Sequence, residues 1–195
     1  ESGGSFDLEL QGLHRDGHRF WIRVIGEAEV GDPSASRITG TLQDISTDKR
    51  AEETLRIQAR TDPLTGLMNR DAVLNELAER LADESRATVA VLYIDLDRFK
   101  TVNDVLGHNA GDELLMQAAA RIQRAVGAGG QVARFGGDEF LVVCDAGANQ
   151  ELPVQLAEAV LAAFNESFRF GKDEFAITTS IGLACAPDDV LRAQQ

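Results

Sequence analysis

The sequence predicts an α/β domain in which helices and strands form layers around one sheet, preceded by a shorter antiparallel β segment. Two patterns support this fold class. Apolar and polar residues alternate over residues 6–24, as in half-buried strands, and from about residue 70 helical periodicity alternates with β-prone runs. The chain has 195 residues, of which 44% are hydrophobic, so one domain with a sizeable core and part of another can form.

The net charge and the short length of the apolar runs limit the kinds of partner that the chain can bind. The formal net charge of −13 argues against a nucleic acid, because a phosphate backbone is held through a basic stripe. No apolar run approaches the roughly 18 residues of a membrane span. Cys144 and Cys185 lie in predicted strands without metal-ligand spacing, as reduced, buried thiols do. We therefore expect a cytoplasmic protein without direct membrane contact; because residue 1 is Glu, we expect a fragment, which leaves room for a membrane segment upstream.

Residues 1–46 are predicted to form an antiparallel segment. Asp16 and Gly17 are typical of a hairpin turn between two alternating strands, and a third strand is expected over residues 37–42. One apolar face of such a sheet needs a cover, which this stretch does not supply. His14 and His18 flank the turn, and we interpret them as solvent-exposed hairpin histidines rather than as haem or metal ligands.

Residues 47–61 change to helical periodicity. Ala51, Leu55 and Ala59 are spaced four apart on a charged helix, and Pro63 requires that the helix has ended. A narrow apolar stripe of this kind favours a seam between two copies of the chain. The alternative is a solvated linker.

The first helix and strand of the following domain have clear signals. Asn69 is suited to cap a helix, whose core face we expect to consist of Leu74, Leu77, Ala78 and Leu81. The continuous apolar run over residues 88–94 predicts a strand that is buried on both faces.

Four further elements complete the predicted layers. A short helix is expected to begin near Phe99 and to end at Gly107, and the next helix is expected to begin at Gly111 and Asp112. In that position Asp112 could be no more than a favourable partner of the helix dipole. A helix over residues 153–164 and one late strand over residues 174–186 follow.

Residues 131–144 predict a β-hairpin with a tight turn at Gly136 and Gly137, because adjacent glycines accept positive φ angles. Such a turn has no side chains and leaves open backbone for a ligand, with Asp138 and Glu139 beside it. A polar hairpin tip without any site is the alternative.

The strand predicted over residues 88–94 supplies two more carboxylates that bear on the hairpin. It ends in Asp95 and Asp97, which share a face because side chains alternate along a strand. One of them can meet Asp138 if this strand neighbours the hairpin. Carboxylates repel each other unless a cation joins them, so the pattern favours Mg²⁺ that carries nucleotide phosphates.

Four ordered motifs resemble the GGDEF family of diguanylate cyclases. They are DPLTGLMNR at 62–70, DLDRFKTVND at 95–104, GHNAGD at 107–112 and RFGGDEF at 134–140. The likeness extends to SIG at 180–182 and implies the α+β palm of nucleotidyl cyclases, a central, mainly antiparallel sheet flanked by helices. Residues 15–21 and 40–46 are similar to the C-terminal half of a PAS sensory domain. These resemblances divide the chain into a PAS half-domain at 1–46, a signalling helix at 47–61 and a GGDEF domain, incomplete at its C-terminus, at 62–195.

The resemblance to the GGDEF family implies that two GTP molecules condense into cyclic di-GMP and two pyrophosphates, with Mg²⁺ or Mn²⁺, in a homodimer joined through the linker helix and the PAS segment. Matched to the motifs, the metal ligands are Asp95, the carbonyl of Leu96 and Asp138, and Glu139 is a stabiliser or base. The substrate-binding residues are Asn103 and Asp112 for guanine, Phe99 and Lys100 for the phosphates, and Gly136 and Gly137 in the hairpin.

Two departures from the family and one rival function accompany this resemblance. The family's Arg-x-x-Asp inhibitory site falls on Gly-Ala-Gly-Gly at 127–130, so we expect no inhibitory site. The closing helix with its phosphate-contacting Lys and Arg would follow Asp189, whereas the sequence stops at Gln195. The rival is a non-catalytic GTP-binding module that controls an adjacent phosphodiesterase domain; a third reading is a PAS dimerisation scaffold with an inert partner.

Overall fold

The computed structural model describes residues 5–29, 37–83, 88–146, 151–170 and 173–186. The chain divides into two compact units, Glu1–Ile57 and Gln58–Gln195, each of which is treated by itself. Within the described ranges no helix is both long and apolar enough to cross a membrane.

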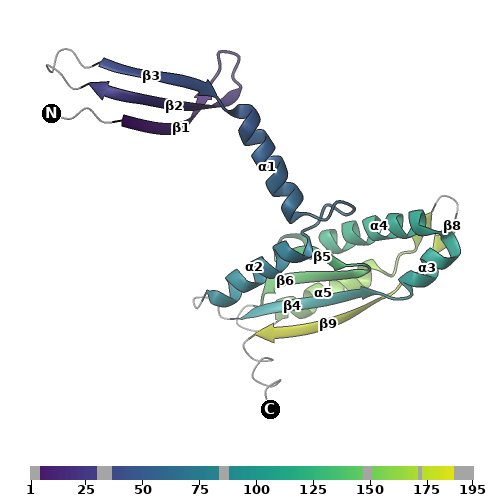
Figure 1. The fold of residues 1–195 in the computed structure, drawn as a ribbon. Coiled ribbons are helices and arrows are strands. Elements are labelled where there is room, and N and C mark those ends of the chain that lie inside the picture. Colours follow the sequence, from purple (N-terminus) through teal and green to yellow (C-terminus); the bar gives the residue numbers. More distant parts are fainter. Residues whose placement is uncertain (1–4, 30–36, 84–87, 147–150, 171–172, 187–195) are drawn as a thin grey trace. The chain divides into compact units, whose positions relative to one another are not determined.

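The N-terminal unit is a three-stranded antiparallel sheet in the order β1-β2-β3. Its strands are β1 (Ser5–Leu13), β2 (Arg19–Glu29) and β3 (Arg37–Asp44) (Figure 1). Gly17 has a φ of +92° in the turn between the first two strands, a conformation that glycine adopts without strain. The predicted hairpin and the predicted third strand are therefore confirmed.

One face of this sheet is apolar and exposed. Leu8 pairs with Val24, and Val24 pairs with Leu42, so the three side chains lie on the same face. Leu8 is 49% exposed and Leu42 70% exposed. The requirement for a cover, inferred from the alternating pattern, holds in the described structure.

Helix α1 (Ser46–Arg60) follows the sheet directly. The Ser46 hydroxyl accepts a hydrogen bond of 2.8 Å from the Trp21 amide, which ties the start of the helix to β2. None of the residues of α1 is buried; Leu55 is 66% exposed and Ile57 52% exposed. The predicted helix is thus confirmed.

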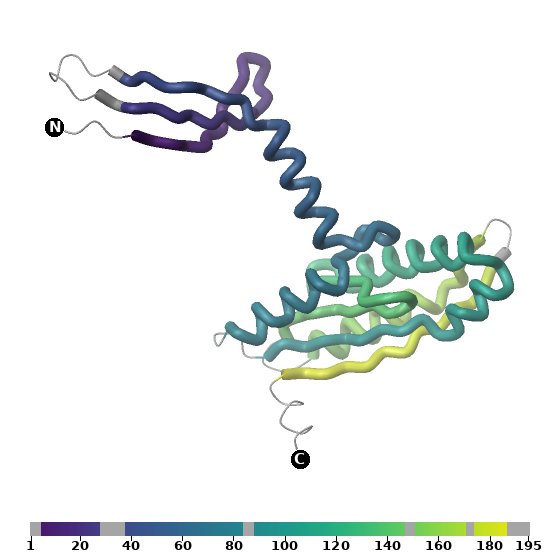
Figure 2. The backbone as a smooth tube through the Cα atoms, viewed as in Figure 1, coloured from purple at the N-terminus to yellow at the C-terminus, as the bar shows by residue number. Residues whose placement is uncertain are grey.

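The C-terminal unit is built on a four-stranded antiparallel sheet in the order β5-β6-β4-β9. Its strands are β4 (Val89–Leu96), β5 (Gln131–Gly136), β6 (Glu139–Asp145) and β9 (Thr179–Ala186). The helices are α2 (Arg70–Ala82), α3 (Phe99–Leu106), α4 (His108–Val126) and α5 (Glu151–Ala163), and a single 3-10 turn covers Gly127–Gly129. A short hairpin of β7 (Phe168–Phe170) and β8 (Asp173–Phe175) completes the unit. Figure 2 traces β4 leading into α3, and α3 into α4.

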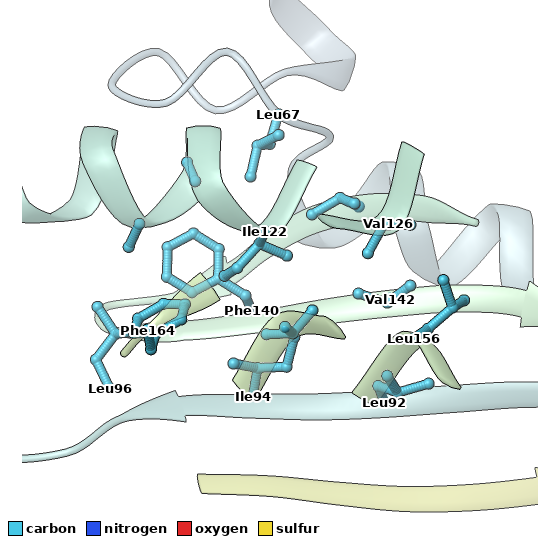
Figure 3. Packing of buried hydrophobic residues seen from close by; sticks show 14 of the residues in the cluster. Leu67, Leu92, Ile94, Leu96, Ile122, Val126, Phe140, Val142, Leu156 and Phe164 are labelled. Carbon is cyan, nitrogen blue, oxygen red and sulfur yellow. The ribbon is translucent and has the colours of Figure 1, made fainter. Parts of the chain in front are cut away.

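The main core lies between the sheet and helices α4 and α5. Alternate residues of β4 and β6, among them Ile94 and Phe140, face this core with no exposed surface (Figure 3). Ile122 from α4 and Leu156 from α5 pack against them. A smaller cluster on the opposite face holds α2 through Val73. The layered α/β class with a central antiparallel sheet is confirmed.

The buried face of α2 differs from the prediction. Val73 is fully buried and Leu77 half-buried, whereas Leu74 is 40% exposed and Leu81 53% exposed; Ala78 is exposed as well. Two apolar stripes, one residue apart, run along this helix, and periodicity alone does not select between them. Asn69 caps the helix as predicted, accepting a hydrogen bond of 2.9 Å from the Ala72 amide.

Strand β4 is buried on one face and partly open on the other. Tyr93 is 38% exposed and Val91 half-buried, so the prediction of burial on both faces is wrong. The reason is that α2 packs mainly over β5 and β6, so the cluster around Val73 includes Val89 and Val91 of β4 and does not include Tyr93.

Two further boundaries differ from those predicted. Helix α4 begins at His108, because Gly107, with φ +87°, both ends α3 and precedes α4. The late strand is two strands, since residues 176–178 between β8 and β9 are not extended in a ladder. Cys144 and Cys185 are buried thiols, as expected, and burial raises the pKa of Cys144 to about 11. The expected closing segment after Asp189 lies outside the described residues.

Candidate functional site

The end of β4 and the start of β6 bring the predicted carboxylates together. Asp95 pairs with Glu139 in the antiparallel register, and the Leu96 amide donates a 3.3 Å hydrogen bond to the carbonyl of Asp138. The strand β4 therefore neighbours the hairpin, which was the condition for these carboxylates to meet.

The hairpin turn is one residue later than predicted. β5 ends at Gly136 and β6 begins at Glu139, so the turn consists of Gly137 and Asp138. Of the two glycines, only Gly137 has a positive φ, of +51°. The ladder is irregular between Arg134 and Gly136, and Gly136 pairs with Glu139 as the last residue of β5. The Asp138 carboxylate is therefore carried by the turn itself.

Arg134 fixes this turn to the loop before α2. Its Nε and Nη2 atoms donate to the carbonyl of Gly137 at 3.0 and 2.8 Å, and its Nη1 atom donates to Asp62 at 3.2 Å. The Thr65 amide and hydroxyl also donate to Asp62, at 2.8 and 2.7 Å. Burial opposes ionisation of Asp62, but these hydrogen bonds and the guanidinium outweigh it and hold the pKa below its usual value. Sequence reasoning placed both residues in motifs and missed that they clamp the turn.

The ionised form of Asp95 is disfavoured by its surroundings. Burial, followed by the charges of Asp138, Glu139 and Asp97, raises the pKa of Asp95 above its ordinary value. Asp97, in contrast, accepts hydrogen bonds of 2.6 Å from Thr178 and 2.7 Å from Ser180, which hold its pKa low. The structure therefore directs Asp95 toward the hairpin, while Asp97 secures the start of β9.

A first prediction concerns the stability of this carboxylate cluster. As the pH rises from the ordinary Asp value of 3.8 through the raised pKa of Asp95, the native state loses a proton that the unfolded chain has already lost. The free energy of unfolding therefore falls over this window. We expect Asp95→Asn to raise Tm by a few degrees at pH 7 in a chelator, measured by thermal unfolding. An unchanged or lower Tm would show that Asp95 is not under strain.

Tyr93 tethers the second hairpin carboxylate. Its hydroxyl is hydrogen-bonded to Glu139, and this bond is the main cause that raises the pKa of Tyr93 to about 12. The Phe135 ring meets the Tyr93 ring edge-on at 5.8 Å, and the Arg70 guanidinium lies 4.7 Å over the Phe135 ring. Because Tyr93 lies within an apolar run, sequence reasoning assigned it no polar role.

The start of α3 carries an unusual backbone conformation. Among the described residues, Arg98 is the one non-glycine residue with positive φ, at +61°. It precedes Phe99 and Lys100, the first residues of α3, whose amides have no partner within the helix. Such amides favour phosphate groups. A pocket of about 750 Å³ adjoins this corner and includes Asp95 and Arg98 in its lining.

Asn103 and Asp112 lie on neighbouring helices. A Cβ atom built on Gly111 would fall 2.0 Å from the Asn103 Oδ1 atom, so the Asn103 side chain lies directly over Gly111, next to Asp112. Asp112 is exposed in the second turn of α4, because that helix starts at His108. The first turn of α4 contains no acidic residue, which removes the argument that Asp112 serves the helix dipole.

A second prediction follows from this close approach. Gly111→Ala should add helix propensity, yet its methyl group requires Asn103 to move. If Asn103 positions a nucleotide base, we expect the KM for GTP to rise about 10-fold, the value of one lost hydrogen bond, while Tm stays equal or rises. Steady-state kinetics and thermal unfolding of the same variant test this. An unchanged KM would separate Asn103 from substrate binding.

Comparison with known proteins agrees with this geometry. The family model "Diguanylate cyclase, GGDEF domain" matches residues 59–195. The chain is 38% identical over 190 residues to the cyclic di-GMP phosphodiesterase PdeR of Escherichia coli, an alignment that covers 96% of this chain and 28% of that protein. The chain thus spans less than a third of the length of the curated relatives it matches, such as PdeR.

Solved structures show the same fold. The coiled coil and GGDEF domain of DgcB from Caulobacter crescentus, in complex with c-di-GMP, is 29% identical with a TM-score of 0.67 and covers 74% of this chain and 78% of that one. A sensory box/GGDEF family protein from Caulobacter crescentus is 40% identical with a TM-score of 0.60 and covers 67% and 85%. From about residue 59 onward, this chain belongs to the GGDEF domain family of diguanylate cyclases.

Proposed function

We propose that the C-terminal unit is an active diguanylate cyclase. Two GTP molecules condense into cyclic di-GMP: each 3′-hydroxyl attacks the α-phosphate of the other nucleotide, a phosphodiester bond forms, and pyrophosphate leaves. The observation that supports catalysis most strongly is the convergence of Asp95, Asp138 and Glu139 at the junction of β4 and β6. Mere binding of a nucleotide does not require a complete set of carboxylates.

The donor set at this junction fits Mg²⁺ or Mn²⁺. Both ions prefer carboxylate and carbonyl oxygens, and the raised pKa of Asp95 reflects clustered negative charge that a cation relieves. Asp95, Asp138 and the carbonyl of Leu96 would hold the ion. When bound, it would supply a lower pKa for the attacking hydroxyl and charge neutralisation at phosphorus. Glu139, oriented by Tyr93, stands beside this position as stabiliser or base.

The nucleotide is bound by groups on three elements. Asp112 accepts from the N1–H and N2–H donors of guanine, which adenine does not present in this arrangement, and Asn103 contacts the same base. At the start of α3, the backbone amide of Phe99 donates a hydrogen bond to the phosphates and the positive charge of Lys100 attracts them. Gly136 and Gly137 leave room above the hairpin: a Cβ on Gly137 would meet no atom within 4 Å.

Catalysis requires two domains facing each other, since each holds one GTP. We propose a homodimer joined through the linker helix and the N-terminal segment. Leu55, which is 66% exposed, together with the exposed Ala51 and Ala59 one turn to either side, forms the narrow apolar stripe that is suited to a helix–helix seam. The three strands before α1 are compatible with the C-terminal half of a PAS domain. The proposed division is therefore a PAS segment at 1–46, a signalling helix at 47–61 and the cyclase at 62–195. We propose that the protein is cytoplasmic.

A GTP-binding regulatory module without turnover is the second candidate. The name of the relative PdeR, a cyclic di-GMP phosphodiesterase that extends far beyond the matched region, favours it. Incubation with GTP and Mg²⁺ and chromatography for cyclic di-GMP separate the two functions. Product from GTP, and none from ATP, supports the cyclase; tight GTP binding by a dimer that makes no product contradicts it.

A further inference from the structure

The turn between β1 and β2 gathers three metal-ligating side chains. His14, Asp16 and His18 each offer one ligand atom, and these three atoms all lie within 4.8 Å of one another. The Asp16 Oδ1 atom is the hub: it lies 2.9 Å from His14 Nδ1 and 2.5 Å from His18 Nδ1. The sequence interpretation of exposed histidines is right about exposure, but it overlooked that the turn places a carboxylate between them.

The backbone fixes this arrangement. Leu13 and Arg19 form the last residue pair of the ladder, and one position further the His14 amide donates a 2.8 Å hydrogen bond to the His18 carbonyl. The Gly17 amide closes the turn by donating to the His14 carbonyl at 2.9 Å. The two imidazoles therefore stand opposite each other, and their rings stack with centroids 4.5 Å apart and an interplanar angle of 19°.

We propose that His14, Asp16 and His18 bind one divalent first-row transition metal ion of the Zn²⁺ class. Two imidazole nitrogens and one carboxylate oxygen form a donor set that such ions favour. The ion binds each neutral imidazole through Nδ1, and the single proton of each coordinated ring is then on Nε2. Water fills the open coordination positions.

Because its three ligands are exposed, this site can bind an ion with little loss of hydration free energy. The side chains of His14, His18 and Asp16 are 54%, 59% and 62% exposed, so neither the ligands nor the ion must be buried without water. Because the stacked rings direct their Nδ1 lone pairs along nearly parallel planes, at least one exposed imidazole must rotate about its side-chain torsions for both to share one ion. Hard ions such as Mg²⁺ prefer oxygen ligands, so this site and the carboxylate cluster near Asp95 take different metals.

The test is isothermal titration calorimetry of the whole chain with Zn²⁺, in excess Mg²⁺ to saturate the carboxylate cluster. We expect one Zn²⁺ per chain, and an affinity at least about 100-fold weaker in His14→Ala and in His18→Ala, since even outer-shell changes cost 10- to 100-fold. His108→Ala is the matched control, because His108 is the third histidine of the sequence and lies on α4. It should leave the Zn²⁺ affinity unchanged.

Asp16→Asn tests the hub separately. Asn suits the same turn and retains an oxygen that can accept from the His18 amide, as Asp16 Oδ1 does at 3.2 Å, but it lacks the charge. We expect weaker Zn²⁺ binding with an unchanged Tm of the metal-free chain. Equal Zn²⁺ affinity in the wild type and both histidine variants, or an absence of Zn²⁺ binding in excess Mg²⁺, overturns the proposal. None of these outcomes depends on cyclase activity.

Discussion

Asp138→Ala is expected to reduce the rate of cyclic di-GMP formation about 1,000-fold, the upper end of the range for loss of one charge-stabilising group. The Asp138 side chain belongs to the two-residue turn between β5 and β6 and adds negative charge beside Asp95. Its removal deprives the site of a metal ligand. The same removal relieves repulsion, so the fold should be retained with an equal or higher Tm.

Turnover and thermal unfolding are measured on the same Asp138→Ala preparation. Glu158→Ala is a suitable control, because Glu158 is an exposed carboxylate on α5 and belongs neither to the hairpin nor to the carboxylate cluster. The control should show wild-type rates. Wild-type turnover by Asp138→Ala would contradict the assignment of the metal site, and an unfolded variant would contradict the argument from repulsion.

Asp112→Asn is expected to lower kcat/KM for GTP by about 10- to 100-fold, the value of a hydrogen bond to a charged group. Asp112 offers two acceptor oxygens, whereas Asn presents one acceptor and one donor that repels a guanine N–H. Asp112 is exposed on α4 beside Asn103, so the substitution should not disturb the core. The loss therefore reports on recognition.

Inosine triphosphate makes this test specific, because it lacks only the N2 amino group of GTP. The wild type should discriminate strongly between GTP and inosine triphosphate. In Asp112→Asn this discrimination should shrink. Undiminished discrimination in the variant would assign guanine recognition to residues other than Asp112.

Local signals predicted the elements that frame the site. The hairpin at β5 and β6, the glycine stop at Gly107 and the Asn69 cap each depend on the conformation of a few neighbouring residues. The sequence also indicated that Asp95 or Asp97 can meet the hairpin carboxylates if their strand neighbours the hairpin, and the pairing of Asp95 with Glu139 meets that condition.

What the sequence did not reveal depends on packing between distant segments. The Arg134–Asp62 contact and the Tyr93–Glu139 hydrogen bond join residues whose proximity exists only in the folded sheet. The left-handed conformation of Arg98 could not be predicted from its residue type, because positive φ angles are typical of glycine and asparagine. The surrounding structure imposes it. The turn was placed one residue early for the same reason: the ladder decides which of two glycines it absorbs.

The most direct test of the central claim is the initial rate of cyclic di-GMP formation from GTP and Mg²⁺, measured by chromatography over a range of protein concentrations. The proposed mechanism predicts product from GTP but not from ATP, with a rate per chain that rises with concentration until the dimer is saturated. Absence of product from a dimer that binds GTP, or a rate per chain independent of concentration down to the monomer, would contradict it.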